Sequence, residues 1–232
     1  MHTTQATYTT LRQGLDDAAL LSTEHQLHLA SLLGGHPKWR LTIGAGNAEF
    51  ITRAGTILTA TVHPIGIMDS DTWTWAWCDP RIPDSQRRAA RQVEAFGHAH
   101  RISMLEHEHY PLTAAHTRVT ADQLVVFSKN VHRLWRHFAF EMRDNSTLYA
   151  ALHFTDLELP PPSVASIRQT VRTTVSAVPL TRFRRATVSY ARLRGIPHRE
   201  TRAHDRIQLM ADDGTVELDW TTGALRMDNA AL

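Results

Sequence analysis

The spacing of hydrophobic residues changes period along the chain, and each change predicts an element. Residues 5–33 carry leucine and alanine at helical spacing, and Gly34-Gly35 ends that helix. From residue 39 to residue 78 the period becomes two, which is typical of strands with one buried face. Such stretches lie at about residues 39–43, 48–52, 56–67 and 71–78. Short turns join them, so we expect a four-stranded antiparallel meander.

The last of these stretches has the most informative pattern. Trp73, Trp75 and Trp77 occupy alternate positions, which places them on one face of a strand. We expect Trp73 and Trp75 to lie in the main core under the helix that bears Phe127. Trp77 lies nearest the end of the strand, and we expect it to be the most exposed of the three.

Helices and strands alternate in the middle of the chain. The pattern predicts a helix over residues 84–98, a strand over 104–112, an amphipathic helix after Thr120 and a hairpin of residues 138–142 and 147–154. The apolar stripe of the helix after Thr120 consists of Leu124, Phe127, Val131, Leu134 and Phe138. The hairpin is expected to turn at Asp144-Asn145.

A proline run marks the clearest internal boundary, at Leu159-Pro160-Pro161-Pro162-Ser163. Consecutive prolines cannot continue a strand ladder and favour an extended spacer. We therefore expect one domain over residues 1–158 and a smaller segment over residues 159–232 that docks on it. The smaller segment reads as two helices followed by three strands. The expected fold class is α+β: an antiparallel β-meander packed with helices, followed by a smaller ααβββ segment.

Composition indicates a folded protein of the cytoplasm. The chain is 42% hydrophobic and 21% charged, and its apolar runs are far shorter than the roughly 20 residues that span a bilayer. Its single cysteine, Cys78, cannot form an internal disulfide, and the first residues do not resemble a secretory signal. We expect no membrane association. The chain also lacks phosphate-loop, dinucleotide-binding and HExxH motifs, so no cofactor is expected.

The tryptophan strand carries a resemblance to a known family. Its sequence is Trp73-Thr74-Trp75-Ala76-Trp77-Cys78-Asp79-Pro80, and a second proline and a helix with Gly97 near its end follow. This segment resembles a bacterial family of unknown function that has a Trp-x-Trp-Ala-Trp-Asn-like signature at the end of a small antiparallel sheet. The similarity covers residues 27–112, and Cys78 stands where an asparagine is usual. The resemblance supports the predicted sheet and implies no activity.

The end of the tryptophan strand is the first candidate site. Trp77 and Asp79 are candidate ligand-binding residues, because aromatic faces bind apolar rings, bases or sugars. The alternative is a core strand covered by a helix. Burial of the tryptophan side chains is worth about 5–9 kcal/mol in total, which is itself a sufficient reason for their presence.

Histidines supply the second candidate site. The members of this group are His98, His100, His107, His109 and His116, with Glu106 and Glu108 beside them. A His-x-His pair on a strand is a known metal-ligand spacing, but zinc needs three or four converging donors. We expect no metal. If the protein were instead a hydrolase, possibly metal-dependent, His98, His100, His107 and His109 would be its ligands. The other interpretation is a solvated edge strand.

Arginines supply the third candidate. The segment from Arg168 to Arg206 contains ten arginines and two acidic residues, which gives it a net charge of +8. Arg182, Arg185 and Arg192 share one side of the last helix, and we expect them to bind an acidic protein partner if the segment is functional. A solvated basic face is the alternative. No recognition helix or aromatic–basic motif is present, so nucleic acid is not the expected partner.

The sequence therefore favours a cytoplasmic globular binding or regulatory protein without catalytic activity, whose ligand and partner it does not identify. A hydrolase built around the histidines is the alternative from another class. Binding of nucleic acid or an acidic partner by the arginine-rich segment is the third.

Overall fold

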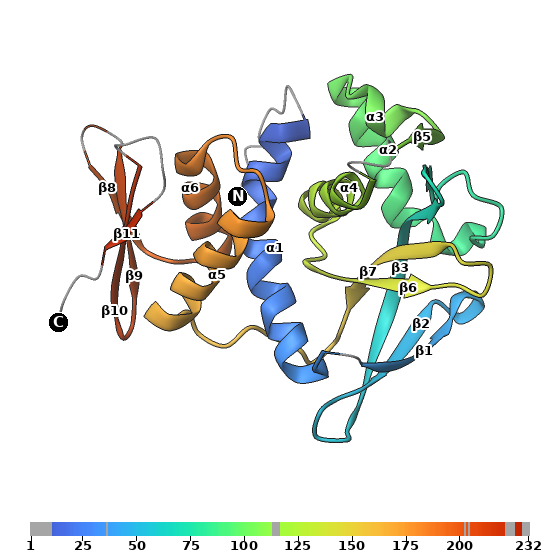
Figure 1. The fold of residues 1–232 in the computed structure, drawn as a ribbon, viewed down its shortest axis with the longest axis horizontal. Helices are drawn as coiled ribbons and strands as arrows, with labels where there is room; N and C mark the ends of the chain where they lie inside the picture. Colours follow the sequence, from blue (N-terminus) through green and yellow to red (C-terminus); the bar gives the residue numbers. More distant parts are fainter. Residues whose placement is uncertain are drawn as a thin grey trace.

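The protein is described here from a computed structural model that covers residues 11–35, 37–112, 117–201, 203, 205–220 and 226–228; for residues 117–120 and 228 it describes the backbone. The predicted start of the first helix, before residue 11, lies outside these residues. Within them the chain forms six α-helices and two antiparallel sheets (Figure 1). The α+β prediction is confirmed.

The larger sheet contains the predicted meander. Its strands are β1 (Lys38–Thr42), β2 (Asn47–Ile51), β3 (Ile57–Asp69), β4 (Thr72–Trp75), β5 (His109–Pro111), β6 (Arg136–Glu141) and β7 (Thr147–His153). They run in the order β1-β2-β3-β4-β5, while β7 pairs with the other edge of β3 and with β6. The long strand β3 is thus the centre of the sheet, with β2 and β4 along one edge and β7 along the other.

Helices separate the two sheets. They are α1 (Leu11–Leu33), α2 (Arg88–His100), α3 (Ser103–Glu106), α4 (Thr117–His132), α5 (Val164–Ala177) and α6 (Phe183–Arg194). Figure 1 shows α1 between α4 on one side and α5 and α6 on the other. Leu15 of α1 belongs to the core of the larger sheet, whereas Leu20 and Leu21 pack with Ile167 and Tyr190. The division into residues 1–158 and 159–232 stays a prediction.

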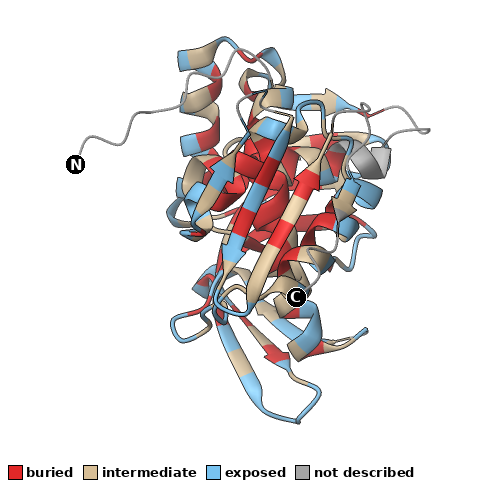
Figure 2. Ribbon diagram, turned by 90° about the vertical axis from the view of Figure 1, so that its left-hand side faces the viewer, coloured by how far each residue is buried: buried red, intermediate tan, exposed pale blue. Residues whose placement is uncertain are grey.

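The smaller sheet covers the far side of α5 and α6. It contains β8 (His198–Glu200), β9 (Arg206–Ala211), β10 (Gly214–Asp219) and β11 (Arg226–Asp228) in the order β11-β10-β9-β8. Figure 2 shows buried residues alternating with exposed ones along β9, where Ile207 and Leu209 are buried, and with intermediate ones along β10. The three predicted strands are present, and the short β8 is additional.

The expected position of the tryptophans is confirmed. Trp73 and Trp75 are fully buried and share a core cluster with Phe127 of α4. Their rings meet edge to face at 5.3 Å, and Trp75 Nε1 donates a hydrogen bond to Met104 O at 3.1 Å. A Cβ atom on Gly66 would lie 2.2 Å from the Trp73 ring, so only glycine fits on the neighbouring strand.

Three predicted boundaries were wrong. The strand predicted over residues 71–78 ends at Trp75, so Trp77 lies in the turn after β4 rather than on the strand. Residues 104–106 belong to the helix α3 rather than to a strand. A Cβ atom added to Gly97 of α2 would lie 2.6 Å from the Cβ atom of Leu105, so α3 packs closely against α2 at this glycine. The apolar stripe that continued to Phe138 spans two elements. The helix α4 ends at His132, where Arg133 adopts a left-handed φ of 61°, and Phe138 lies in β6.

Candidate functional site

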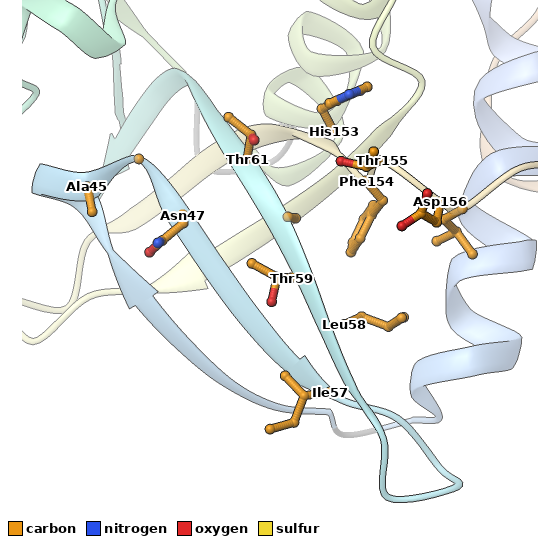
Figure 3. Close-up of a pocket in the computed structure, with 13 residues that line it drawn as sticks. Ala45, Asn47, Ile57, Leu58, Thr59, Thr61, His153, Phe154, Thr155 and Asp156 are labelled. Carbon is orange, nitrogen blue, oxygen red and sulfur yellow. The ribbon is translucent and has the colours of Figure 1, made fainter.

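A groove with a volume of about 590 Å³ lies beside the first half of β3 (Figure 3). It is lined by residues 45–47, 57–61 and 153–157. In Figure 3, Thr59 and Thr61 stand on β3, while Thr155 and Asp156 stand on the chain that leaves β7. The groove therefore extends across β3, from residues 45–47 on its β2 side to the segment that leaves β7, which is the neighbour of β3 farther along the sheet.

The groove exists because β7 leaves the sheet before β3 ends. The pairing of β3 with β7 ends at Thr61 and His153. The next residue, Phe154, is buried in the core and lies 6.1 Å from the Phe50 ring. The chain then turns at Thr155-Asp156 toward the proline run. Residues 57–60 of β3 are left with β2 on one edge and the groove on the other.

Backbone hydrogen bonds show which groups of β3 face the groove. Val62 N–H donates to Gly46 O, and Thr52 N–H donates to Thr56 O, both at 2.8 Å. Successive residues of an antiparallel strand direct their N–H and C=O groups to opposite neighbours. Leu58 and Ala60 therefore bond with β2, whereas Ile57 and Thr59 point their backbone groups into the groove. No described residue pairs with these groups there.

Side chains around the groove are also without partners. Asn47, Thr59, Thr61, Thr155 and Asp156 are exposed, and their side chains make no hydrogen bond or ion pair with the described residues. Asp156 and His153 are the only ionisable side chains of the lining, which contains no lysine or arginine.

An apolar rim continues the groove at the tip of the β2–β3 hairpin. Ile57 is 64% exposed and Ile51, which lies directly across from it on β2, is 43% exposed. Leu58 and Leu157 are half-buried. The groove thus combines open backbone groups, polar side chains without partners among the described residues, and exposed apolar surface.

The predicted ligand residues Trp77 and Asp79 lie elsewhere, in the turn that follows β4. Trp77 is half-buried and packs against both cores of the larger sheet. The carboxylate of Asp79 is 2% exposed and lies 2.8 Å from the guanidinium of Arg81, which also reaches Asp144 at 3.1 Å. Burial alone would raise the pKa of Asp79, but the hydrogen bonds and charge of Arg81 outweigh it and hold this pKa below its ordinary value. In the structure these contacts connect two loops, and a ligand role for Trp77 and Asp79 stays a prediction.

The structure does not bring the candidate histidines together. Nδ1 of His107 lies 2.8 Å from Ser103 O, and Nδ1 of His109 lies 3.1 Å from Thr74 Oγ1. His98 and His100 are in the last turn of α2, where the His100 ring stacks on Phe96, and His116 lies outside the described residues. Among the side chains that the structure describes, no group of three or more histidines, cysteines or acidic residues could hold a metal ion.

Two arginines of the arginine-rich segment form ion pairs with acidic residues of α1. Two hydrogen bonds of 2.6 and 2.7 Å join Arg185 to the carboxylate of Asp17, and Arg194 pairs with Glu24 at 3.1 Å. Asp16 accepts hydrogen bonds from the backbone N–H and hydroxyl of Thr181. Of the predicted partner-binding residues, Arg185 is thus engaged internally, whereas Arg182 and Arg192 have exposed side chains. Their role in binding a partner stays a prediction.

Sequence reasoning missed a group of buried nitrogen atoms on the opposite side of α1. Lys129 is fully buried, and its Nζ donates to the hydroxyl of Ser22 at 2.6 Å. Burial lowers the pKa of Lys129 well below its ordinary value and that of His132 to about 3. His137 is also buried, with its pKa lowered well below the ordinary value by the same cause. Burial thus favours the neutral form of each group, and no described cavity reaches them.

Together, the fold and the groove define an α+β protein whose central strand leaves part of one edge open. The chain belongs to the family described as a family of unknown function (DUF6882), whose model matches residues 12–156. A comparison with curated proteins finds no match, and neither does a comparison with solved structures. None of the described helices is both long enough and apolar enough to cross a membrane.

The match confirms the expected membership of an uncharacterised family and extends beyond residues 27–112. A bacterial source and the tryptophan signature stay predictions. The matched region includes α1, the larger sheet and all of the groove lining except Leu157, whereas α5 and α6 lie outside it.

Proposed function

We propose that the protein is a non-catalytic binding protein that takes up an extended segment of another polypeptide in the groove beside β3. In such strand addition, main-chain hydrogen bonds supply affinity and alternate side chains supply specificity. The observation that carries the proposal is the open edge of β3, where Ile57 and Thr59 direct their backbone groups into a groove. A cytoplasmic location is part of the proposal, because a chain with one cysteine needs no oxidising compartment.

A comparison of the open edge of β3 with the outer strand β1 supports the proposal. Proteins usually protect an exposed edge with lysine, proline, a bulge or a covering segment. The outer strand β1 carries Lys38 and Arg40, both exposed. Residues 57–60 of β3 carry neither charge nor proline. An unprotected edge of this kind is expected where a partner strand binds.

The affinity expected from the backbone alone is small. Two residues offer about four hydrogen bonds, each worth roughly 0.5–1.5 kcal/mol after exchange with water. Much of this gain offsets the entropy lost on association. Contacts with Ile57 and with the polar lining are therefore needed for useful affinity, and we expect a transient rather than a permanent complex.

The position of the groove relative to the family also supports the proposal. All lining residues but one fall within the matched residues 12–156, and the arginine-rich helices do not. A binding role of the groove would therefore belong to the family domain itself.

A library of eight-residue peptides displayed on phage and selected against the full chain tests the proposal. Thr59→Pro removes an N–H group that points into the groove and leaves the bonds to β2 in place, so it should reduce binding of the selected peptides at least tenfold. The matched control Thr59→Val keeps the backbone group and should bind as the wild type does. Equal binding by Thr59→Pro would contradict the proposal.

Methylation of the peptide backbone gives a second readout that does not depend on the fold of a variant. A strand that pairs with β3 directs every second N–H group to it. Single N-methyl groups along the peptide should therefore weaken binding at alternate positions. A uniform effect along the peptide would exclude strand addition.

A further inference from the structure

We infer that the segment bound in the groove carries a basic residue that pairs with Asp156; this inference rests on the proposed function and specifies the partner of the same site. The lining contains one carboxylate and no lysine or arginine. Asp156 is exposed and forms no ion pair with the described residues. The groove therefore presents an uncompensated negative charge to its occupant.

The position of Asp156 lets one bound residue reach it while the backbone pairs with β3. Figure 3 shows Asp156 across the hollow from Thr59, on the chain that has just left the ladder at His153. A strand rises about 3.3 Å per residue, so about four residues pass along the open edge of β3. A strand opposite Thr59 lies between the two sides of the groove, and its long basic side chains extend from the backbone toward the carboxylate.

The neighbouring segment adds to the same charge. Glu158 lies two residues beyond Asp156, is exposed, and makes no ion pair with the described residues. Acidic peptides and phosphate-bearing ligands would meet only repulsion here. The groove thus favours an extended basic peptide over nucleic acid, which requires positive charge along its path.

The other end of the groove selects an apolar residue. Ile51 and Ile57 form an exposed cross-strand pair at the tip of the β2–β3 hairpin. A bound strand that passes this tip buries apolar surface against Ile57, the member of the pair that lies on β3 and lines the groove. The inferred partner is therefore an extended segment with an apolar residue near one end of the contact and a basic residue near the other.

Matched peptides test the charge preference directly. The probes are eight-residue peptides of alternating threonine and valine, acetylated and amidated, with a single lysine, glutamine or glutamate placed in turn at each of the four central positions. Dissociation constants are measured by fluorescence for the full chain. At the best position, lysine should bind two- to fivefold more tightly than glutamine, the range expected for an exposed ion pair, and glutamate more weakly than glutamine. The difference should shrink as salt rises.

Variants of the protein assign the preference to Asp156. Asp156→Asn should abolish the difference between lysine and glutamate peptides, and Asp156→Lys should reverse it. Asp69→Asn, which changes an exposed aspartate at the far end of β3, is the matched control and should keep the wild-type preference. If the peptides bind in a manner sensitive to Thr59→Pro but show no preference for lysine, this inference is overturned while the proposed function stands. If no peptide binds, the proposed function itself is overturned.

Discussion

Within the part of the chain that the structure describes, polar groups have hydrogen-bond partners in one region of the molecule and lack them in another. The first region is the interface between α1 and α6, and the second is the groove beside β3. At the interface, the buried carboxylates of Asp16, Asp17 and Glu24 all accept hydrogen bonds from α6 or from the residues that precede it. In the groove, the backbone groups of Ile57 and Thr59 and the surrounding polar side chains have no partner among the described residues. The charge of a segment is thus a poor guide to its availability for binding.

The difference follows from burial. A buried charge without a partner is costly, so the arginines of α6 are needed by the fold itself. Open groups in the groove are solvated, and water satisfies them at little cost until a strand displaces it. We therefore expect the interface to determine stability and the groove to determine binding, and the predictions below separate the two.

Breaking the Arg185–Asp17 pair should have the largest effect. Arg185→Ala leaves the buried Asp17 carboxylate without its bidentate partner, and loss of one member of a buried pair costs about 3–5 kcal/mol. The free energy of unfolding in urea measures this. Arg192→Ala, at an exposed position of the same helix, is the control and should cost less than about 0.5 kcal/mol. Equal effects would show that the interface does not depend on the pairing.

Acid should destabilise the opposite side of α1. Burial lowers the pKa of His132 to about 3, and that of His137 lies well below its ordinary value, while both histidines titrate near 6.5 in the unfolded chain. Below pH 6.5 the unfolded state binds more protons than the folded state, so stability falls as pH falls toward 3. Each histidine contributes a slope of about 1.4 kcal/mol per pH unit below about pH 6. Urea unfolding at pH 7, 6 and 5 measures the slope, and His132→Gln should make it shallower. A flat profile from pH 7 to 5 would contradict the buried neutral state.

Proline substitutions compare the two edges of β3. Leu58→Pro removes an N–H group that bonds with β2, and we expect a loss of about 3 kcal/mol or more in unfolding free energy. Thr59→Pro removes an N–H group that has no partner, and we expect a loss of about 1 kcal/mol or less. Thermal and urea unfolding of the two variants measure the difference. Similar losses of unfolding free energy in the two variants would indicate that the N–H group of Thr59 also has a hydrogen-bond partner in the folded protein.

Charge reversal at the exposed arginines should have the smallest effect. Arg192→Glu should change the unfolding free energy by less than about 0.5 kcal/mol, because an exposed side chain contributes little to stability. It should also leave peptide binding in the groove unchanged, which native mass spectrometry or fluorescence measures. Reduced peptide binding by this variant would indicate that α6 also contributes to the binding site.

Much of the fold could be predicted because single faces are buried. The period of two predicted the presence and order of β1 to β4, since residues such as Ala48 and Phe50 face the core while their neighbours face water. It failed at the end of β4, which stops at Trp75 and leaves Trp77 in a turn. The burial of Trp73 and Trp75 followed from the same rule. The pattern failed where two elements share one stripe, as between Leu134 and Phe138, and where a strand is as short as β8.

The pairing of α1 with α6 and the groove could not be predicted because both depend on contacts between distant residues. Asp17 meets Arg185 across 168 residues, so part of the charge of the arginine-rich segment is paired with a helix that is distant in the sequence. The groove depends on where β7 separates from β3, between Thr61 and His153. Its key groups are backbone atoms of Ile57 and Thr59, which no motif encodes.

Amide hydrogen exchange of β3, followed residue by residue by NMR in the free protein, tests the central claim most directly. If the edge is open, Leu58 and Ala60 should exchange slowly because they bond with β2, and Ile57 and Thr59 should exchange much faster. Protection of all four amides to the same degree would show that the edge is already covered and would contradict the account.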